Sequence, residues 1–131
     1  MTKKENSELE EIVQGIQDKK GFNILVLDVQ EISSLTYYFV LAEGRVERHL
    51  KAISDEVLER MRKMGHKPLM VEGEDGGDWV VIDFGDIMVH LFKPSVREKY
   101  GLEEVWRDSK LVDCGIDEKA NADNSADLND F

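Results

Sequence analysis

The chain has 131 residues, the size of one domain, and its 41% hydrophobic and 34% charged residues are typical of a globular protein. Its formal net charge of −11 argues against direct binding to nucleic acid, because such binding usually needs a basic surface that displaces counterions. The single cysteine excludes an intramolecular disulfide and a cysteine-based zinc site, and no apolar run approaches the roughly 18 residues needed to span a bilayer.

The first predicted element is a helix. Residues 7–10, Ser-Glu-Leu-Glu, have the form of a capping box, which predicts that the helix begins at Ser7. Four apolar residues then follow at helical spacing on one face: Leu9, Ile12, Val13 and Ile16. Gly21 is suited to the C-terminal cap.

Two strands and a long helix come next. The nearly continuous apolar run 22–29 favours a strand buried on both faces, and residues 36–42 predict a second strand. Apolar residues then recur at steps of three or four over about 45–64, which predicts an amphipathic helix ended by Gly65.

The next segment predicts a strand at 68–72, a glycine-rich loop at 73–78 and a tight hairpin. Strands at 79–84 and 87–92 are joined by Gly85-Asp86, and a two-residue loop of this kind fixes the strand register. The register pairs Ile82 with Val89, Val81 with His90, and Trp79 with Phe92.

Alternation of side chains gives this hairpin two different faces. The first is aliphatic or phenylalanine throughout and suits a core: Val80, Ile82, Phe84, Ile87, Val89 and Leu91. The second mixes aromatic and polar residues and suits a binding patch: Trp79, Val81, Asp83, Met88, His90 and Phe92. The alternative is that a helix covers this face too, with His90 and Asp83 satisfied by local hydrogen bonds.

The predicted body ends with a short helix from Pro94 and a group of apolar residues that includes Tyr100 and Trp106. The order of elements predicts an α/β sandwich with a mixed sheet of about five strands and flanking helices. Residues 1–112 form the predicted domain. Residues 113–131 are acidic and poor in apolar residues, which predicts a disordered tail.

Catalytic and metal-binding patterns are weak. The three histidines are far apart, and none is paired at the spacing of a helical metal site. Cys114 has no nearby histidine, and Asp83 and Asp86 stand on either side of a turn rather than as an Asp-x-Asp pair on one strand. We therefore expect no enzyme activity, metal or cofactor.

The hairpin and the segment after it resemble the ribosomal silencing factors of the iojap family. The similarity lies in a tryptophan-led strand, a Gly-Asp turn, a Val-His-Leu-Phe strand and a later Arg…Tyr-x-Leu-Glu-x-Val-Trp pattern that ends at Trp106. It covers about residues 8–112. The chain departs from the family pattern at Tyr37 and Glu43, where the family usually has aspartate and serine.

This resemblance implies a fold similar to nucleotidyltransferases without their catalytic acids. It also implies binding to protein L-fourteen of the large ribosomal subunit, a steric block to subunit joining and repression of translation when nutrients are scarce. The residues expected at the contact are Trp79, His90 and Phe92, with Val80, Asp83, Tyr100 and Trp106 as further candidates. Val80 is the weaker choice because the register turns it inward, and Tyr100 and Trp106 are equally compatible with packing.

Two other functions remain open from the sequence: a nucleotidyltransferase relic with residual activity, and an interaction module with a partner outside the ribosome. An apolar patch that awaits a partner also supports a homodimer of the free protein. The absence of an Arg- and Ser-rich leader favours a bacterial cytoplasm, and we expect no membrane contact and no sequence-specific contact with nucleic acid.

Overall fold

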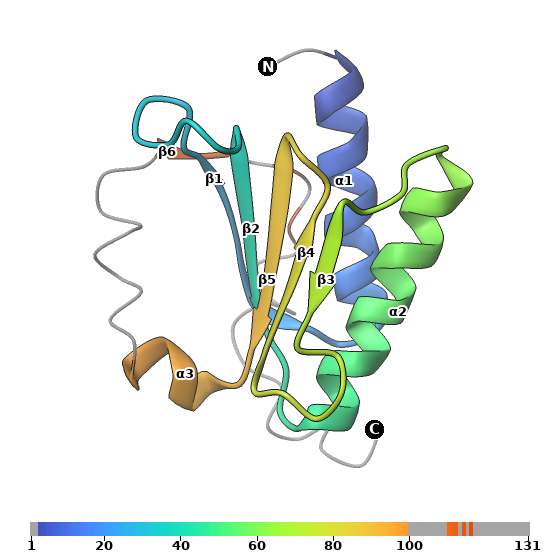
Figure 1. The fold of residues 1–131 in the computed structure, drawn as a ribbon, viewed down its shortest axis with the longest axis vertical. Coiled ribbons are helices and arrows are strands. Elements are labelled where there is room, and N and C mark those ends of the chain that lie inside the picture. Colours follow the sequence, from blue (N-terminus) through green and yellow to red (C-terminus); the bar gives the residue numbers. More distant parts are fainter. Residues whose placement is uncertain (1–2, 100–109, 113, 115, 117–131) are drawn as a thin grey trace.

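The computed structural model describes residues 3–99, 110–112, 114 and 116 (Figure 1). Its elements in chain order are α1 (Lys3–Asp18), β1 (Phe22–Asp28), β2 (Tyr38–Glu43), α2 (Glu47–Lys63), β3 (Met70–Glu72), β4 (Trp79–Asp83), β5 (Ile87–Phe92), α3 (Pro94–Lys99) and β6 (Lys110–Leu111). The strands form one mixed sheet in the order β3-β4-β5-β2-β1-β6. The α/β class is confirmed, with six strands instead of about five.

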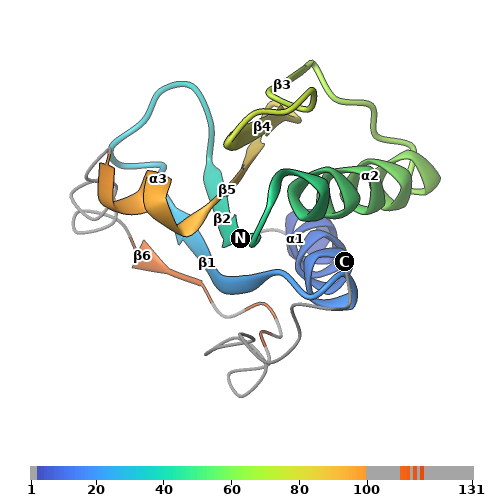
Figure 2. The same cartoon turned by 90° about the horizontal axis from the view of Figure 1, so that it is seen from below.

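The sheet lies between two layers of helix (Figure 2). Helices α1 and α2 cover one face, and α3 lies on the opposite face. The main core fills the space under α1 and α2, where apolar residues of both helices meet the inward residues of β1, β2, β4 and β5. A smaller cluster lies on the α3 face and contains Leu27, Val29, Leu41, Phe92 and Val96.

Helix α1 begins earlier than predicted. It starts at Lys3, so Ser7 lies inside the helix and the predicted capping box does not mark its first turn. Lysine and glutamate among residues 3–6 are good helix formers, which is consistent with an extra turn before Ser7. The predicted apolar stripe is confirmed, because its four residues are at most 1% exposed: Leu9, Ile12, Val13 and Ile16.

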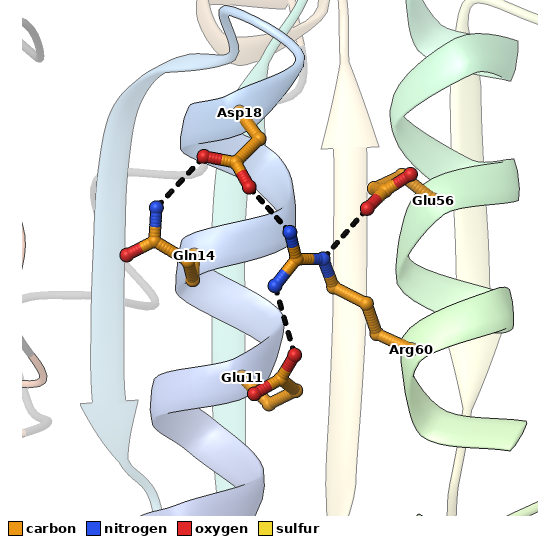
Figure 3. Close-up of polar contacts among 5 residues, drawn as sticks. All are labelled: Glu11, Gln14, Asp18, Glu56 and Arg60. Carbon is orange, nitrogen blue, oxygen red and sulfur yellow. Dashed lines mark hydrogen bonds and ion pairs between the residues drawn. The ribbon is translucent and has the colours of Figure 1, made fainter. Parts of the chain in front are cut away.

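One arginine joins α1 to α2 (Figure 3). The Arg60 guanidinium of α2 donates to Glu56 Oε2 at 2.7 Å, to Glu11 Oε1 at 2.8 Å and to an Asp18 carboxylate oxygen. These charge-assisted bonds raise the pKa of Arg60, with the bond to Glu56 as the largest cause. Gly15 leaves room for the arginine, since a Cβ at that position would lie 2.9 Å from Arg60 Cδ.

The hairpin of β4 and β5 has the predicted register. Trp79 pairs with Phe92, and Val81 pairs with His90. The turn is closed by a hydrogen bond of 2.9 Å from the Phe84 amide to the Ile87 carbonyl. The aliphatic face is confirmed as the core face: five of its residues are at most 1% exposed, and Phe84 packs against them in part.

The packed body continues beyond the predicted boundary at residue 112. Strand β6 pairs antiparallel with β1, where Leu27 lies opposite Leu111. Cys114 is 3% exposed and belongs to the main core, and Ile116 packs against that core. A two-residue strand has no periodic signal, so β6 was not predicted from the sequence.

Candidate partner-binding face

The candidate face is the side of the sheet that lies away from α1 and α2. Strand alternation and pairing place five partly exposed side chains there, and we call them the Trp79 face: Phe39, Met70, Trp79, Val81 and Met88. Among the described elements, α3 is the only helix on this side (Figure 2). It packs through Val96 onto the small cluster near β1 and β2. The Trp79 face spans β3, β4, β5 and β2 beside that cluster.

Trp79 is fixed in place by His90. The indole Nε1–H donates to His90 Nδ1 at 3.1 Å, and the two ring centroids are 5.9 Å apart. The ring also packs against the small apolar cluster while remaining partly exposed. This is the arrangement of a rigid aromatic anchor, because few side-chain rotations remain to be lost on binding.

His90 is held in its neutral form. Because Nδ1 accepts the bond from Trp79, the ring proton of the neutral form belongs on Nε2. The Nε2 atom is buried and has no hydrogen-bond partner among the described residues. Phe39 packs edge-on against the imidazole with ring centroids 5.1 Å apart. Burial in this setting lowers the pKa of His90 to about 4.

Two residues of the predicted patch are buried. Phe92 is 1% exposed and belongs to the small cluster under α3, so it supports the Trp79 face from beneath and offers no exposed surface. Val80 is also 1% exposed and lies in the main core, as its register predicted. Phe92 and Val80 are therefore not exposed on the Trp79 face, contrary to the expectation for Phe92.

Asp83 has a local structural role. Its Oδ1 accepts a hydrogen bond of 2.8 Å from the amide of Gly85 and so stabilises the hairpin turn. The side chain remains partly exposed at the end of β4. Tyr100 and Trp106, the last two predicted candidates, lie outside the described residues.

Two members of the face, Phe39 and Met70, join it through strand pairing across the sheet. Val81 and Met88 were on the predicted mixed face but were not chosen as contacts, whereas Phe39 and Met70 were not predicted at all. Phe39 lies opposite Met88 because β2 runs parallel to β5, and Met70 lies opposite Asp83. The sequence shows that Phe39 is an aromatic residue in a strand, but it does not show that this strand pairs with β5.

Acidic residues dominate the rim of the face. Glu72 and Asp86 are exposed, and Asp83 is partly exposed. Lys93, directly after β5, pairs with Asp78 at 2.9 Å. Its pKa is raised mainly by that hydrogen bond. The arrangement can bind an apolar surface flanked by positive charge.

The described part of the chain has neither a metal-binding group of side chains nor a helix that could span a membrane. Over residues 3–99 and the few described positions after residue 109, no three His, Cys, Asp or Glu side chains gather in a group that could hold a metal ion. None of the described helices is both long and apolar enough to cross a membrane.

Comparison with known proteins identifies the family. The profile of a family described as "Ribosomal silencing factor during starvation" matches residues 2–130. The chain belongs to the ribosomal silencing factor family. This confirms the resemblance found in the hairpin, and the match extends past residue 112 into the acidic segment.

Proteins of two bacteria are similar to the chain over most of its length. A ribosomal silencing factor of Bacillus subtilis is 35% identical over 96 residues, which cover 73% of this chain and 81% of that protein. A crystal structure of a Chromobacterium violaceum protein has a TM-score of 0.74 at 32% identity, over 84% of this chain and 90% of the other.

A mouse protein named "Mitochondrial assembly of ribosomal large subunit protein 1" is 29% identical over 102 residues. The match covers 76% of this chain but only 45% of the mouse protein, so the similarity is to one part of that protein.

Proposed function

We propose that the protein binds the large ribosomal subunit through protein L-fourteen and prevents the small subunit from joining. Membership of the silencing factor family supports the ribosome as the target, and the mouse relative is named for the large subunit. The single structural observation that supports the contact is the Trp79 face. It offers an aromatic anchor, fixed by His90, on a partly exposed and mainly apolar surface.

The contact is proposed to be with protein rather than with ribosomal RNA. The face has an acidic rim, and the chain has a net charge of −11, so phosphate groups would be repelled. A basic surface of a ribosomal protein would complement the rim and accelerate association. The anchor would then supply most of the binding free energy, as aromatic residues do at the centre of interfaces.

Silencing in this proposal needs no catalysis. A bound body of this size acts by occupying the surface that the small subunit would contact, and it represses translation for as long as it stays bound. The family description mentions silencing during starvation, which supports repression under nutrient limitation. We place the action in the bacterial cytoplasm, where the ribosomes are, and we propose that the free protein can pair with a second copy through the same face.

Calorimetric titration of the protein with purified L-fourteen tests the contact. The proposal expects saturable one-to-one binding that is weakened by at least about 30-fold in the Trp79→Ala variant and kept in Leu35→Ala. Leu35 is the matched control because it is an apolar residue that is 84% exposed in the loop before β2, outside the Trp79 face. The absence of binding at micromolar concentrations, or equal binding by both variants, would contradict the proposal.

A further inference from the structure

The three histidines of the chain differ in how their ring nitrogens are satisfied. Both nitrogens of the buried His49 have backbone partners, at 3.0 and 2.7 Å. His66 places its Nε2 atom 2.8 Å from a carboxylate oxygen of Glu8. Of the three, only His90 has a buried ring nitrogen, Nε2, without a hydrogen-bond partner among the described residues. His90 therefore stands apart from the two histidines whose contacts are structural.

The bond from Trp79 determines which nitrogen of His90 is the donor. The indole Nε1–H can only donate, so His90 Nδ1 accepts and the proton of the neutral ring is on Nε2. The same bond fixes the orientation of the imidazole and hence the direction of the Nε2–H group. A buried donor that lacks an acceptor costs stability, and native proteins keep few such groups, so this one calls for an explanation.

The side chains around His90 on this side of the sheet offer no acceptor. Phe39 packs edge-on against the imidazole with ring centroids 5.1 Å apart, and Val81 is the strand partner of His90 in β4. Met88, two residues before His90, lies on the same side of β5. Asp83 is the acidic residue of β4 on this side, and its Oδ1 binds an amide of the hairpin turn. An acceptor for Nε2 therefore has to come from outside the described residues.

The charges beside the Trp79 face favour a neutral acceptor. Glu72 and Asp86 are exposed there, and Asp83 is partly exposed. These carboxylates repel the oxygen of another carboxylate or of a phosphate. A carbonyl oxygen of a peptide bond or of an amide side chain is a strong hydrogen-bond acceptor without a charge, and it meets no such repulsion.

We propose that His90 Nε2–H is the specificity-determining donor of the Trp79 face and that it binds a carbonyl oxygen of the protein partner. In the complex the partly exposed Phe39 ring gives way to the incoming oxygen, and the apolar side chains around it shield the new bond from water. A partner surface that is apolar but lacks this oxygen leaves the donor unpaired and binds more weakly. The inference rests on the proposed function and adds the chemistry of its contact.

NMR on the full chain with isotope-labelled histidine tests this contact directly. Spectra are compared for the free protein and for its complex with purified L-fourteen, and calorimetry on the same samples shows whether the complex forms. The proton signal of His90 Nε2–H should move downfield in the complex and exchange more slowly with water. The ring signals of His66, which lies in the turn after α2, are the internal reference and should not change.

The His90→Asn variant removes the donor and keeps the support of Trp79. Asparagine places its side-chain oxygen near the position of Nδ1, where it can accept from the indole, and has no atom near Nε2. Affinity for L-fourteen should fall about tenfold, while the indole proton signal of the free variant keeps its position. The matched control is His66→Asn, which removes a ring contact with Glu8 away from the Trp79 face and should leave the affinity unchanged.

Two results would overturn this inference while leaving the proposed function intact. The first is full binding of the wild type with an unchanged Nε2 proton signal, because the donor would then be unpaired, or already paired, in both states. The second is equal affinity of His90→Asn and the wild type. A complete absence of wild-type binding would instead overturn the proposed function, and this inference with it.

Discussion

At the scale of single residues, the pair of Trp79 and His90 determines the character of the candidate face. The imidazole orients the indole through one hydrogen bond, and its own remaining nitrogen is buried. The sequence identified both residues through hairpin register, which is a local property. It did not identify the burial of Phe92, because that depends on Leu41, Val96 and Leu27 from other elements.

The Trp79→Ala change should weaken binding to the large subunit by at least about 30-fold, which is about 2 kcal/mol for an aromatic anchor. Because the indole is only partly buried, the body should stay folded, although loss of its packing will lower the melting temperature somewhat. Binding and thermal unfolding are measured on the same samples. Global unfolding of the variant at 25 °C would instead show that Trp79 is a core residue on which folding depends.

The stability of the protein should depend on the protonation of His90. Burial lowers its pKa in the folded state from the ordinary 6.5 to about 4. As the pH falls below 6.5, the unfolded chain binds the proton and the folded chain does not, so the free energy of unfolding decreases. By pH 5 the loss from this group is about 2 kcal/mol, and it levels off below pH 4.

Urea unfolding at pH 7 and pH 5 measures this dependence, with His90→Gln as the comparison. The wild type should lose about 2 kcal/mol more than the variant over this interval. The other histidines and the carboxylates contribute equally to both proteins and cancel in the difference. Equal losses would show that His90 titrates near its ordinary pKa and that its environment is more hydrated than the structure shows.

At the scale of elements, contacts between neighbours in sequence were predictable and contacts between distant strands were not. The apolar stripe of α1, the span of α2 and the pairing of β4 with β5 all follow from periodicity or turn chemistry. The parallel pairing of β2 with β5 joins strands separated by α2, β3 and β4, and no local pattern specifies it. Phe39 reaches the candidate face only through that pairing, so it was not predicted.

The packing of α1 on α2 should depend on Arg60. Replacing it by methionine keeps much of the aliphatic stem and removes the hydrogen bonds to three carboxylates, which are then left close together. We expect Arg60→Met to lower the free energy of unfolding by about 2 kcal/mol. The measurement is urea unfolding at pH 7.

Arg62→Met is the matched control. Arg62 belongs to the same helix, its side chain is 64% exposed, and its ion pair with Glu59 at 2.7 Å stays within α2. Its loss should change the free energy of unfolding by less than about 0.5 kcal/mol. Similar effects of the two variants would mean that the contacts of Arg60 with α1 contribute little.

The loop before β4 should tolerate no side chain at Gly73. Its φ is +87°, and a Cβ there would lie 2.1 Å from the carbonyl oxygen of Trp79. Gly73→Ala should therefore displace the start of β4 and cost roughly 3 kcal/mol of stability or more. Binding to the large subunit should fall as well, because the displaced residue is the anchor itself.

Gly65→Ala is the control for Gly73→Ala, because it introduces the backbone strain of a positive φ without a steric clash of the new Cβ. Gly65 has the same φ of +87°, yet a Cβ there meets nothing within 4 Å. Its replacement should cost only about 1–2 kcal/mol of strain and leave binding intact. Equal costs at the two positions, measured by thermal unfolding, would show that the loop at Gly73 moves aside without affecting Trp79.

At the scale of the whole molecule, the arrangement of the sheet and the charge of the chain point to the same kind of partner. The Trp79 face is mainly apolar, with acidic residues beside it. The net charge of −11 suggested from the outset that RNA is a poor partner. The sequence could give the charge but not the extent of the face, because the face is assembled from strands that are distant in the sequence.

Sedimentation of mixed ribosomal subunits on a sucrose gradient tests the central claim most directly. Added to equal amounts of large and small subunits, the protein should migrate with the large subunit and reduce the peak of joined ribosomes, whereas Trp79→Ala should do neither. An undiminished joined peak, with the wild-type protein left at the top of the gradient, would contradict the account.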